Sequence, residues 1–228
     1  MDIVLILAGG VGSRAGGSLP KQFQTLKGKR VLWWSVETFR NALPGCRIVL
    51  VVHPEYIENW EQELGKEANQ LNLDVLKTAG GNSRLASVRN GLSFVKELGL
   101  LTLDSKVYIH DSARPLVSDK IIKEGGLKVG PGVGVVPVVP VADSLRRRSE
   151  AGSEPVAREE YMAVQTPQIF MFDDIFAAYS TIDENAAFTD DASVAEKSGI
   201  RIETFEGDPL NFKITRPIDF IVAEHCGH

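Results

Sequence analysis

Residues 3–14 read IVLILAGGVGSR, and this stretch decides how the chain is expected to fold. Its first five residues are apolar without interruption, which is the pattern of a β-strand buried on both faces. Gly9, Gly10 and Gly12 follow. They let the backbone approach a ligand closely, with its N–H groups turned inward. The stretch therefore predicts a buried strand whose carboxyl end opens into a glycine-rich binding loop.

Short apolar runs alternate with helical patterns through the first half of the chain. Strands are expected at Arg47–Val52, Leu73–Leu76 and Lys106–His110, and helices at Val31–Phe39, Glu55–Gln70 and Ser83–Leu98. This alternation predicts the α/β class, with a Rossmann-like, three-layer, mostly parallel sheet covered by helices on both faces. Right-handed crossovers place the carboxyl ends of parallel strands along one edge. The glycine loop, Gly80-Gly81 and Asp111 should therefore share that edge.

Residues 133–158 depart from the alternation. Val133–Pro140 has β character but contains Pro137 and Pro140, and prolines favour edge or bulged strands. Three arginines at 146–148 and a charged stretch with Gly152 then suggest the tip of a hairpin. We interpret this segment as a projecting β-hairpin arm, which has little core of its own and should pack on another subunit. A mobile surface loop is the alternative interpretation.

The composition is that of a single globular domain. The chain has 228 residues and a net charge of −5, which argues against a general nucleic-acid binder but allows a local basic pocket. Cys46 and Cys226 lack metal-ligand spacing and suit a reducing cytoplasm. No apolar run approaches the roughly 18 residues that span a bilayer, and Asp2 does not fit a signal peptide. We expect a cytoplasmic protein without nucleic-acid or membrane partners.

Cations near the glycine loop set it apart from the common nucleotide-binding motifs. Gly10, Gly12 and Ala15 satisfy a relaxed dinucleotide fingerprint, but no acidic residue ends the second strand. The P-loop pattern fails because the chain contains no Gly-Lys-Ser/Thr. Arg14 and Lys21 lie on the same irregular loop, and two cations with inward N–H groups suit a triphosphate. Two solvated surface charges are the alternative interpretation.

Further motifs appear in order along the chain. They are GGNSRLASV at 80–88, HDSARP at 110–115, PVADS at 140–144, QTPQ at 165–168, TDDAS at 189–193 and NFKITRP at 211–217. With the glycine loop and Pro-Lys-Gln at 20–22, the chain resembles the sugar-nucleotide pyrophosphorylase superfamily of nucleotidyltransferases. Within it, the motifs resemble the 2-C-methyl-D-erythritol 4-phosphate cytidylyltransferase family over nearly the whole chain. The resemblance implies a fold of the nucleotide-diphospho-sugar transferase type.

The resemblance also implies a reaction and its residues. CTP and 2-C-methyl-D-erythritol 4-phosphate would give CDP-methylerythritol and pyrophosphate, with Mg²⁺, in non-mevalonate isoprenoid biosynthesis. Arg14 and Lys21 would hold the triphosphate, and Asp111 would bind the metal. Around the cytidine the family implies Ala8, Gly9, Gly10, Gly12, Gly81, Asn82, Arg84 and Ser87. Arg114, Thr189 and Lys213 would face the sugar phosphate.

A homodimer is implied as well. Residues 1–228 would form a single nucleotidyltransferase domain, with residues 137–158 as a β-arm for dimerisation. Ser144 and Arg158 match arm positions that reach the neighbouring subunit's active site in the family. The sequence leaves open whether Arg158 acts in its own subunit or in the neighbouring one. Arg14, Lys21, Lys213 and Arg158 are the candidate catalytic residues.

Three departures from the family pattern keep alternatives open. Residues 8–10 read AGG where many members have AAG, Asn82 replaces a common Asp, and Ser144 replaces a common Thr. The first departure resembles a sister family, ribitol-5-phosphate cytidylyltransferase. Ala113 and the pair Arg216-Pro217 favour the methylerythritol enzyme instead. A non-catalytic nucleotide-binding regulator and a nicotinamide oxidoreductase are more distant alternatives.

The implied reaction depends on cations and geometry more than on acid–base chemistry. The attacking group is a phosphate monoester oxygen that is already ionised at neutral pH, so no general base is needed. His110 ends a buried strand and is expected to be structural. Two anions must instead be brought together, so Mg²⁺ on Asp111 would bridge phosphate oxygens. Arg14 and Lys21 would stabilise the leaving pyrophosphate, and Lys213 would contact the α-phosphate or the attacking group.

Overall fold

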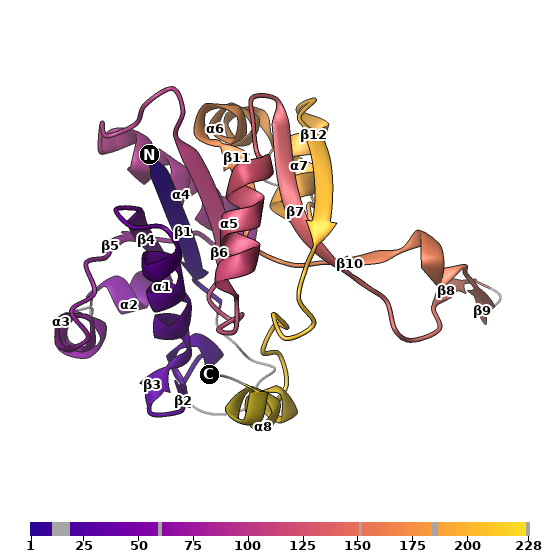
Figure 1. Cartoon of the computed structure of the whole chain (residues 1–228), viewed down its shortest axis with the longest axis horizontal. Coiled ribbons are helices and arrows are strands. Elements are labelled where there is room, and N and C mark those ends of the chain that lie inside the picture. The colour runs from indigo at the N-terminus through magenta and orange to yellow at the C-terminus, as the bar shows by residue number, and fades with distance from the viewer. Residues whose placement is uncertain (11–18, 59–60, 151, 184–186, 227–228) are drawn as a thin grey trace.

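The computed structural model describes residues 1–10, 19–58, 61–150, 152–183 and 187–226 (Figure 1). The strands of its central sheet are β1 (Asp2–Ala8), β4 (Arg47–Val52), β5 (Leu76–Ala79), β6 (Lys106–Asp111), β7 (Val133–Pro140), β10 (Met162–Val164), β11 (Gln168–Met171) and β12 (Arg201–Glu206). They pair in the order β10-β7-β11-β6-β1-β4-β5, and β12 also pairs with β7.

The middle of the sheet is parallel and brings the expected strand ends to one edge. Strand β1 pairs in parallel with both β4 and β6, and β4 pairs in parallel with β5, whereas β11 is antiparallel to β6. The register places Ala8 beside Val52 and Val52 beside Ala79. On the other side Leu7 lies beside Asp111. The prediction that the glycine loop and Asp111 share an edge is therefore confirmed.

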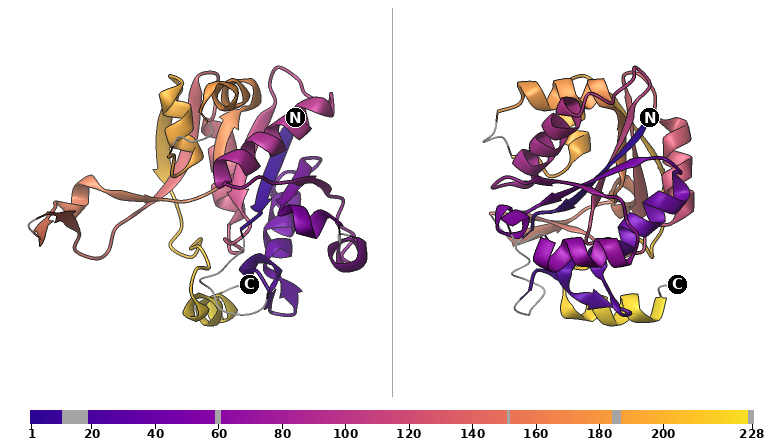
Figure 2. Two further views of the ribbon diagram at one scale, coloured as in Figure 1. Left: turned by 180° about the vertical axis from the view of Figure 1, so that it is seen from behind. Right: turned by 90° about the vertical axis from the view of Figure 1, so that its left-hand side faces the viewer.

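Helices cover both faces of this sheet (Figure 2). They are α1 (Val31–Ala42), α2 (Pro54–Glu58), α3 (Lys66–Gln70), α4 (Arg84–Glu97), α5 (Asp119–Lys128), α6 (Phe172–Thr181), α7 (Asp191–Lys197) and α8 (Pro217–Cys226). Val4 and Ile6 of β1 pack in a cluster with side chains of α1 and α5. The alternate residues Ile3 and Leu5 pack with α4, α6 and α7. Strand β1 is thus buried on both faces, and the predicted three-layer α/β fold is confirmed.

In the segment between β4 and α4, two elements differ from those expected from the sequence. The helix expected over Glu55–Gln70 is split into α2, a π-helical turn at Glu61–Gly65 and α3. Gly65, a poor helix former, lies where the π-helical turn meets α3. The strand expected at Leu73–Leu76 begins only at Leu76. Its start is delayed because the N–H of Leu73 still bonds to the carbonyl of Ala68 at the end of α3.

The assignment of Val133–Pro140 to a projecting arm was wrong. This segment is strand β7, which pairs with β10, β11 and β12 in the main sheet. Burial favours the central sheet over an exposed arm for this segment, since Val135 and Val136 are fully or almost fully buried. Pro137 still contributes to the hydrogen bonding of the strand, since its carbonyl accepts a bond from the N–H of Gln165 at 2.8 Å.

The hairpin beyond β7 consists of β8 (Arg146–Ser149) and β9 (Gly152–Pro155). Figure 1 shows it projecting from the body of the molecule, and every residue in both strands is exposed. The two strands pair in antiparallel register from Arg146 opposite Pro155 to Ser149 opposite Gly152. The use of residues 137–158 for dimerisation stays a prediction.

A smaller cluster fixes the carboxyl-terminal segment against the body. Strands β2 (Thr25–Leu26) and β3 (Lys29–Arg30) form a short hairpin before α1. Leu26 packs there with Val31 of α1, with Ile214 and with Ala223 of α8. This cluster holds the residues just before α8 close to the β2–β3 hairpin and the start of α1. Among the described helices, none combines the length and hydrophobicity needed to cross a bilayer.

Candidate functional site

Asp111 is the last residue of β6 and the centre of the candidate site. Its side chain is 12% exposed, Lys213 Nζ donates to Oδ2 at 2.7 Å, and Arg84 Nε approaches Oδ1 at 3.5 Å. Burial acts to raise the pKa of Asp111, but the charges of Arg84 and Lys213 outweigh it and hold this pKa well below its usual value. The backbone N–H of Asp111 donates to Thr166 Oγ1 at 3.1 Å. The carboxylate is therefore fixed in place and ionised.

Arg84 lies in the first turn of α4 and links two carboxylates. Its terminal nitrogens donate to Asp191 at 2.8 and 2.6 Å, while Nε faces Asp111. Helix α4 begins there because Ser83 caps it, its side chain accepting a hydrogen bond from the N–H of Ala86. Burial acts to lower the pKa of Arg84, but Asp191 and Asp111 outweigh it and raise this pKa further. Arg84 is thus a permanent cation beside Asp111.

The two predicted lysines approach the site from opposite ends of the chain. Lys21 Nζ donates to the carbonyl of Ile214 at 2.8 Å, and Ile214 directly follows Lys213. The N–H of Ile214 in turn bonds to the carbonyl of Ala113 at 2.8 Å. The segment around residue 213 is therefore held between the loop after β1 and the loop after β6, which brings Lys21 and Lys213 to the same region.

Gln22 fixes the start of the glycine loop, and we did not single it out from the sequence. It is only 2% exposed, and its side-chain amide donates to the carbonyls of Ala8 at 2.8 Å and Gly10 at 2.7 Å. The available signal was its place inside the Pro-Lys-Gln motif. One side chain thus donates hydrogen bonds to two carbonyls of the loop backbone. The predicted loop residues Gly12 and Arg14 lie outside the described residues.

The loop before α4 lies beside the glycine loop. The N–H of Gly81 donates to Ser87 Oγ at 3.1 Å, and a Cβ built on Gly81 would lie 2.4 Å from the Cβ of Ala86. A side chain at this position is therefore excluded. A Cβ built on Gly9 would lie 3.5 Å from Ser87 Oγ, so the two loops are adjacent. Asn82 is exposed in the same turn. These predicted nucleoside-binding residues are brought together.

Arg114 adds a third cation near Asp111. It donates to the carbonyl of Asn211 at 2.8 Å and more weakly to that of Val164 at 3.4 Å. Its Nε and the Oδ1 of Asn211 are buried without a hydrogen-bond partner in the described part of the chain. Burial lowers the pKa of the Arg114 guanidinium, although Asp111 acts in the opposite direction. Such incompletely satisfied groups mark a place where a polar ligand can bind.

The remaining predicted site residues are exposed. Thr189 precedes Asp190, whose side chain caps α7 by accepting a hydrogen bond from the N–H of Ser193. Arg158 lies on the arm and donates to the carbonyl of Ala142 at 2.6 Å. Ser144 is exposed nearby. Neither arm residue has a hydrogen bond or ion pair with the Asp111 cluster within the described residues, so a single chain does not bring them to it.

The donors at Asp111 fit a magnesium ion that binds together with phosphates. No group of three or more His, Cys, Asp or Glu side chains able to hold a metal exists in the described part of the chain. Mg²⁺ is commonly bound through one or two carboxylates, with substrate phosphates and water completing its shell. Asp111 supplies one such carboxylate, held ionised by its neighbours. The described residues alone therefore do not form a cage for a permanently bound ion.

His110 has a structural place, as its position at the end of a buried strand indicated. It is completely buried, with Nε2 3.1 Å from the carbonyl of Arg114 and Nδ1 3.1 Å from Thr166 Oγ1. Burial lowers the pKa of His110 from 6.5 to about 4. The ring is therefore neutral near pH 7 and connects the strand to the two loops that flank Asp111.

This lowered pKa gives His110 a measurable effect on acid stability. Because the unfolded chain takes up the proton near pH 6.5 and the folded chain only near pH 4, stability is lost as the pH falls between these values. The loss from this group should be on the order of 3 kcal/mol. We expect His110→Gln to flatten the decline in unfolding free energy between pH 6.5 and 4, measured by urea denaturation. Equal slopes in both proteins would contradict this.

Comparisons with known proteins show which family the chain belongs to. The family model described as IspD, 2-C-methyl-D-erythritol 4-phosphate cytidylyltransferase, matches residues 2–226. The proteins of that name from Bacteroides thetaiotaomicron and Bacteroides fragilis are each 40% identical to the chain, over 220 and 219 residues, covering 96% of each chain. The crystal structure of the Francisella tularensis protein of that name superposes with a TM-score of 0.79 at 27% identity, covering 98% of both chains. The chain belongs to the 2-C-methyl-D-erythritol 4-phosphate cytidylyltransferase family.

Proposed function

We propose that this chain transfers the cytidylyl group of CTP to 2-C-methyl-D-erythritol 4-phosphate in non-mevalonate isoprenoid biosynthesis. The products are CDP-methylerythritol and pyrophosphate. The observation that carries the proposal is the ionised Asp111 with Lys213 and Arg84 against it, at the sheet edge beside the glycine loop. Family membership and the relatives at 40% identity support the choice of substrates.

The charge balance of the site suits two anionic substrates. Its basic side chains outnumber its acidic ones, with Lys21, Arg84, Arg114 and Lys213 against Asp111 and Asp191. This excess of positive charge offsets the repulsion between a triphosphate and a phosphate monoester. It arises locally, although the whole chain has a net charge of −5.

The reaction needs no base from the protein. A phosphate oxygen of methylerythritol phosphate forms a bond to the α-phosphorus of CTP. The bond from that phosphorus to the bridging oxygen of the β-phosphate breaks, and pyrophosphate leaves with the electron pair. In this reaction Lys21 and Arg14 would stabilise the negative charge that develops on pyrophosphate. Lys213 would contact the α-phosphate. Such groups act because they are already oriented before the reaction begins.

Mg²⁺ is the proposed cofactor, and Asp111 is the residue that would hold it together with phosphate oxygens. When bound, the ion would neutralise charge on the phosphates as a Lewis acid. Lys213 and Arg84 keep the Asp111 carboxylate ionised, which a cation ligand requires. The cytidine is assigned to the two adjacent loops at residues 8–12 and 81–87.

We also propose a homodimer in which the arm of one subunit completes the site of the other. Exposed apolar side chains at the base of the arm support this, since Tyr161, just before β10, and Met162 and Val164 of β10 are 45%, 55% and 40% exposed. A hollow of about 590 Å³ lies there, lined in part by Arg158. Ser144 and Arg158 are assigned to the neighbour's sugar phosphate, beside Arg114 and Thr189 of that neighbour. A cytoplasmic location is proposed from the two free cysteines.

The substrate assignment is tested by pyrophosphate release. With CTP and Mg²⁺, we expect turnover on methylerythritol phosphate that exceeds turnover on ribitol 5-phosphate by at least about 100-fold, the scale on which a pocket rejects a substrate with an additional hydroxyl. The CDP-linked product is checked by mass spectrometry. Activity with ribitol 5-phosphate alone would contradict the substrate assignment but would leave the assignment as a cytidylyltransferase intact. Absence of turnover on both would overturn the enzymatic proposal.

The arm assignment is tested by Arg158→Ala. Loss of one charge-assisted hydrogen bond to the sugar phosphate should raise the KM for that substrate on the order of tenfold, with the KM for CTP nearly unchanged. Arg147→Ala is the matched control, since Arg147 lies on the same arm and pairs with Glu154. A rise in the KM for CTP alone in Arg158→Ala would contradict the assignment of the arm to the sugar phosphate.

A further inference from the structure

Asp191 has a buried carboxylate to which the proposed reaction assigns no role. It is the first residue of α7 and has no exposed surface. Capping of this helix is done by Asp190, which leaves the carboxylate of Asp191 for other partners. These are the two terminal nitrogens of Arg84, at 2.8 and 2.6 Å, and the hydroxyl of Tyr179 at 2.6 Å. A buried carboxylate with this geometry is committed to Arg84.

The contact with Asp191 fixes the direction of the Arg84 guanidinium. That group is planar and rigid, so holding both terminal nitrogens also sets where Nε points. Nε faces Asp111 at 3.5 Å, a much weaker contact than the two with Asp191. Arg84 therefore supplies positive charge to Asp111 without forming a close two-pronged pair with it.

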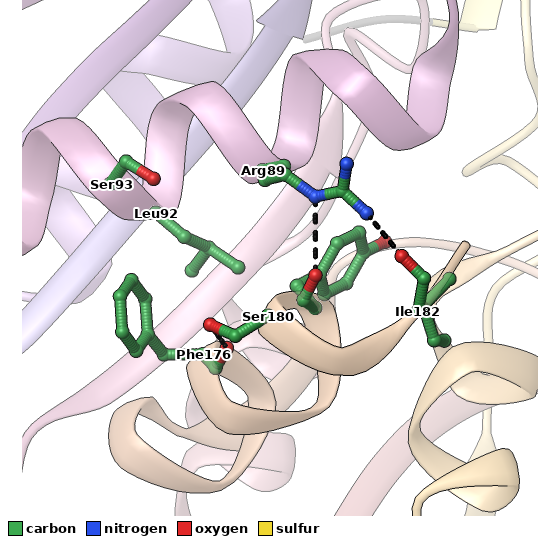
Figure 3. Close-up of a pocket in the computed structure, with 7 residues that line it drawn as sticks. Arg89, Leu92, Ser93, Phe176, Ser180 and Ile182 are labelled. Atoms are coloured by element: carbon green, nitrogen blue, oxygen red, sulfur yellow. Dashed lines mark hydrogen bonds between the residues drawn. The ribbon is translucent and has the colours of Figure 1, made fainter. Parts of the chain in front are cut away.

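Tyr179 ties Asp191 to the helix layer behind the site. Its side chain is 1% exposed, and burial together with Asp191 raises the pKa of its hydroxyl, which stays a donor. Arg89, on the same helix as Arg84, donates to the carbonyls of Tyr179 at 3.1 Å and Ile182 at 2.7 Å. Figure 3 shows the Arg89 side chain extending from α4 toward Ile182. Both residues line a hollow of about 340 Å³. Helices α4 and α6 are thereby locked together.

We infer that Asp191 and Tyr179 are positioning residues for the reaction at Asp111. Asp191 holds both terminal nitrogens of Arg84, and the hydroxyl of Tyr179 holds Asp191. This keeps the guanidinium from pairing fully with Asp111. Asp111 is thus not bound in a two-pronged pair with Arg84 and is left available for the cation that accompanies the triphosphate. The inference rests on the proposed function for its activity measurements and on the Arg84–Asp191 contact for a separate stability measurement.

The activity test is a double-mutant cycle in the pyrophosphate-release assay. Asp191→Asn should lower kcat/KM by on the order of 10–100-fold, since Arg84 is then free to pair with Asp111. Tyr179→Phe retains the ring and should cost about 3–10-fold, the scale of one lost hydrogen bond. If Asp191 acts through Arg84, Asp191→Asn should have no further effect on kcat/KM in an Arg84→Ala background. Equal losses in both backgrounds would overturn the inference.

Asp173→Asn is the matched control. Asp173 lies in the first turn of α6 with a side chain that is 59% exposed, and its ion pair with Lys96 spans 3.3 Å at the surface. Removing this charge should leave kcat/KM within about twofold of wild type, because surface pairs contribute little. A loss as large as that of Asp191→Asn would mean that the measured effect is general to the acidic groups near α6 and α7, and would contradict the inference.

Thermal unfolding gives the readout that does not depend on activity. Arg84→Ala should lower the unfolding midpoint, because it leaves Asp191 buried without its cation, and adding Asp191→Asn should recover part of that loss. Additive losses would overturn the inference. Inactivity of the wild type would instead refute the proposed function, and the Arg84–Asp191 coupling would still be decided from these midpoints. If Asp191→Asn does not fold, Tyr179→Phe replaces it in these measurements.

Discussion

The Asp111 carboxylate is almost shielded from water at the end of β6, and it stays ionised because Lys213 and Arg84 lie against it. These cations come from distant parts of the chain. Arg84 begins helix α4, whereas Lys213 lies on the segment that follows β12 and is anchored through Ile214. One charge interaction therefore connects the central sheet, the helix layer behind it and the carboxyl-terminal segment. Without it the site would hold an unpaired buried charge, which folded proteins avoid.

The same arrangement explains how an acidic chain can bind two anions. The basic side chains come from four separate segments and meet only at the sheet edge, so the total charge says nothing about the site. Gln22 and Ser87 complete it without charge by fixing the backbone of the two adjacent loops. The arm is different, since among the described residues Arg158 bonds to Glu159 and to the carbonyl of Ala142, which both lie on the arm. In the proposed homodimer, the neighbouring subunit would supply its target.

The sequence predicted the elements that are dictated by continuous burial. The runs at β1, β4 and β6 and the amphipathic pattern of α4 gave the sheet edge, and hence the place of Asp111. Local patterns failed where tertiary contacts decide: β7 is a sheet strand despite Pro137 and Pro140, because β10, β11 and β12 surround it. The partners of Arg84 were also missed. Asp191 and Tyr179 come together with it only when α4, α6 and α7 pack, and no spacing in the sequence records that contact.

The central claim is that the charge of Asp111 organises the cations at which the two phosphates meet. Its most direct measurement is kcat for Asp111→Asn, which keeps the shape of the side chain and the backbone bond to Thr166. We predict a fall in kcat by on the order of 10²–10³-fold with the fold intact by circular dichroism, the scale of losing one preorganised electrostatic group. Turnover close to that of the wild type would contradict the account.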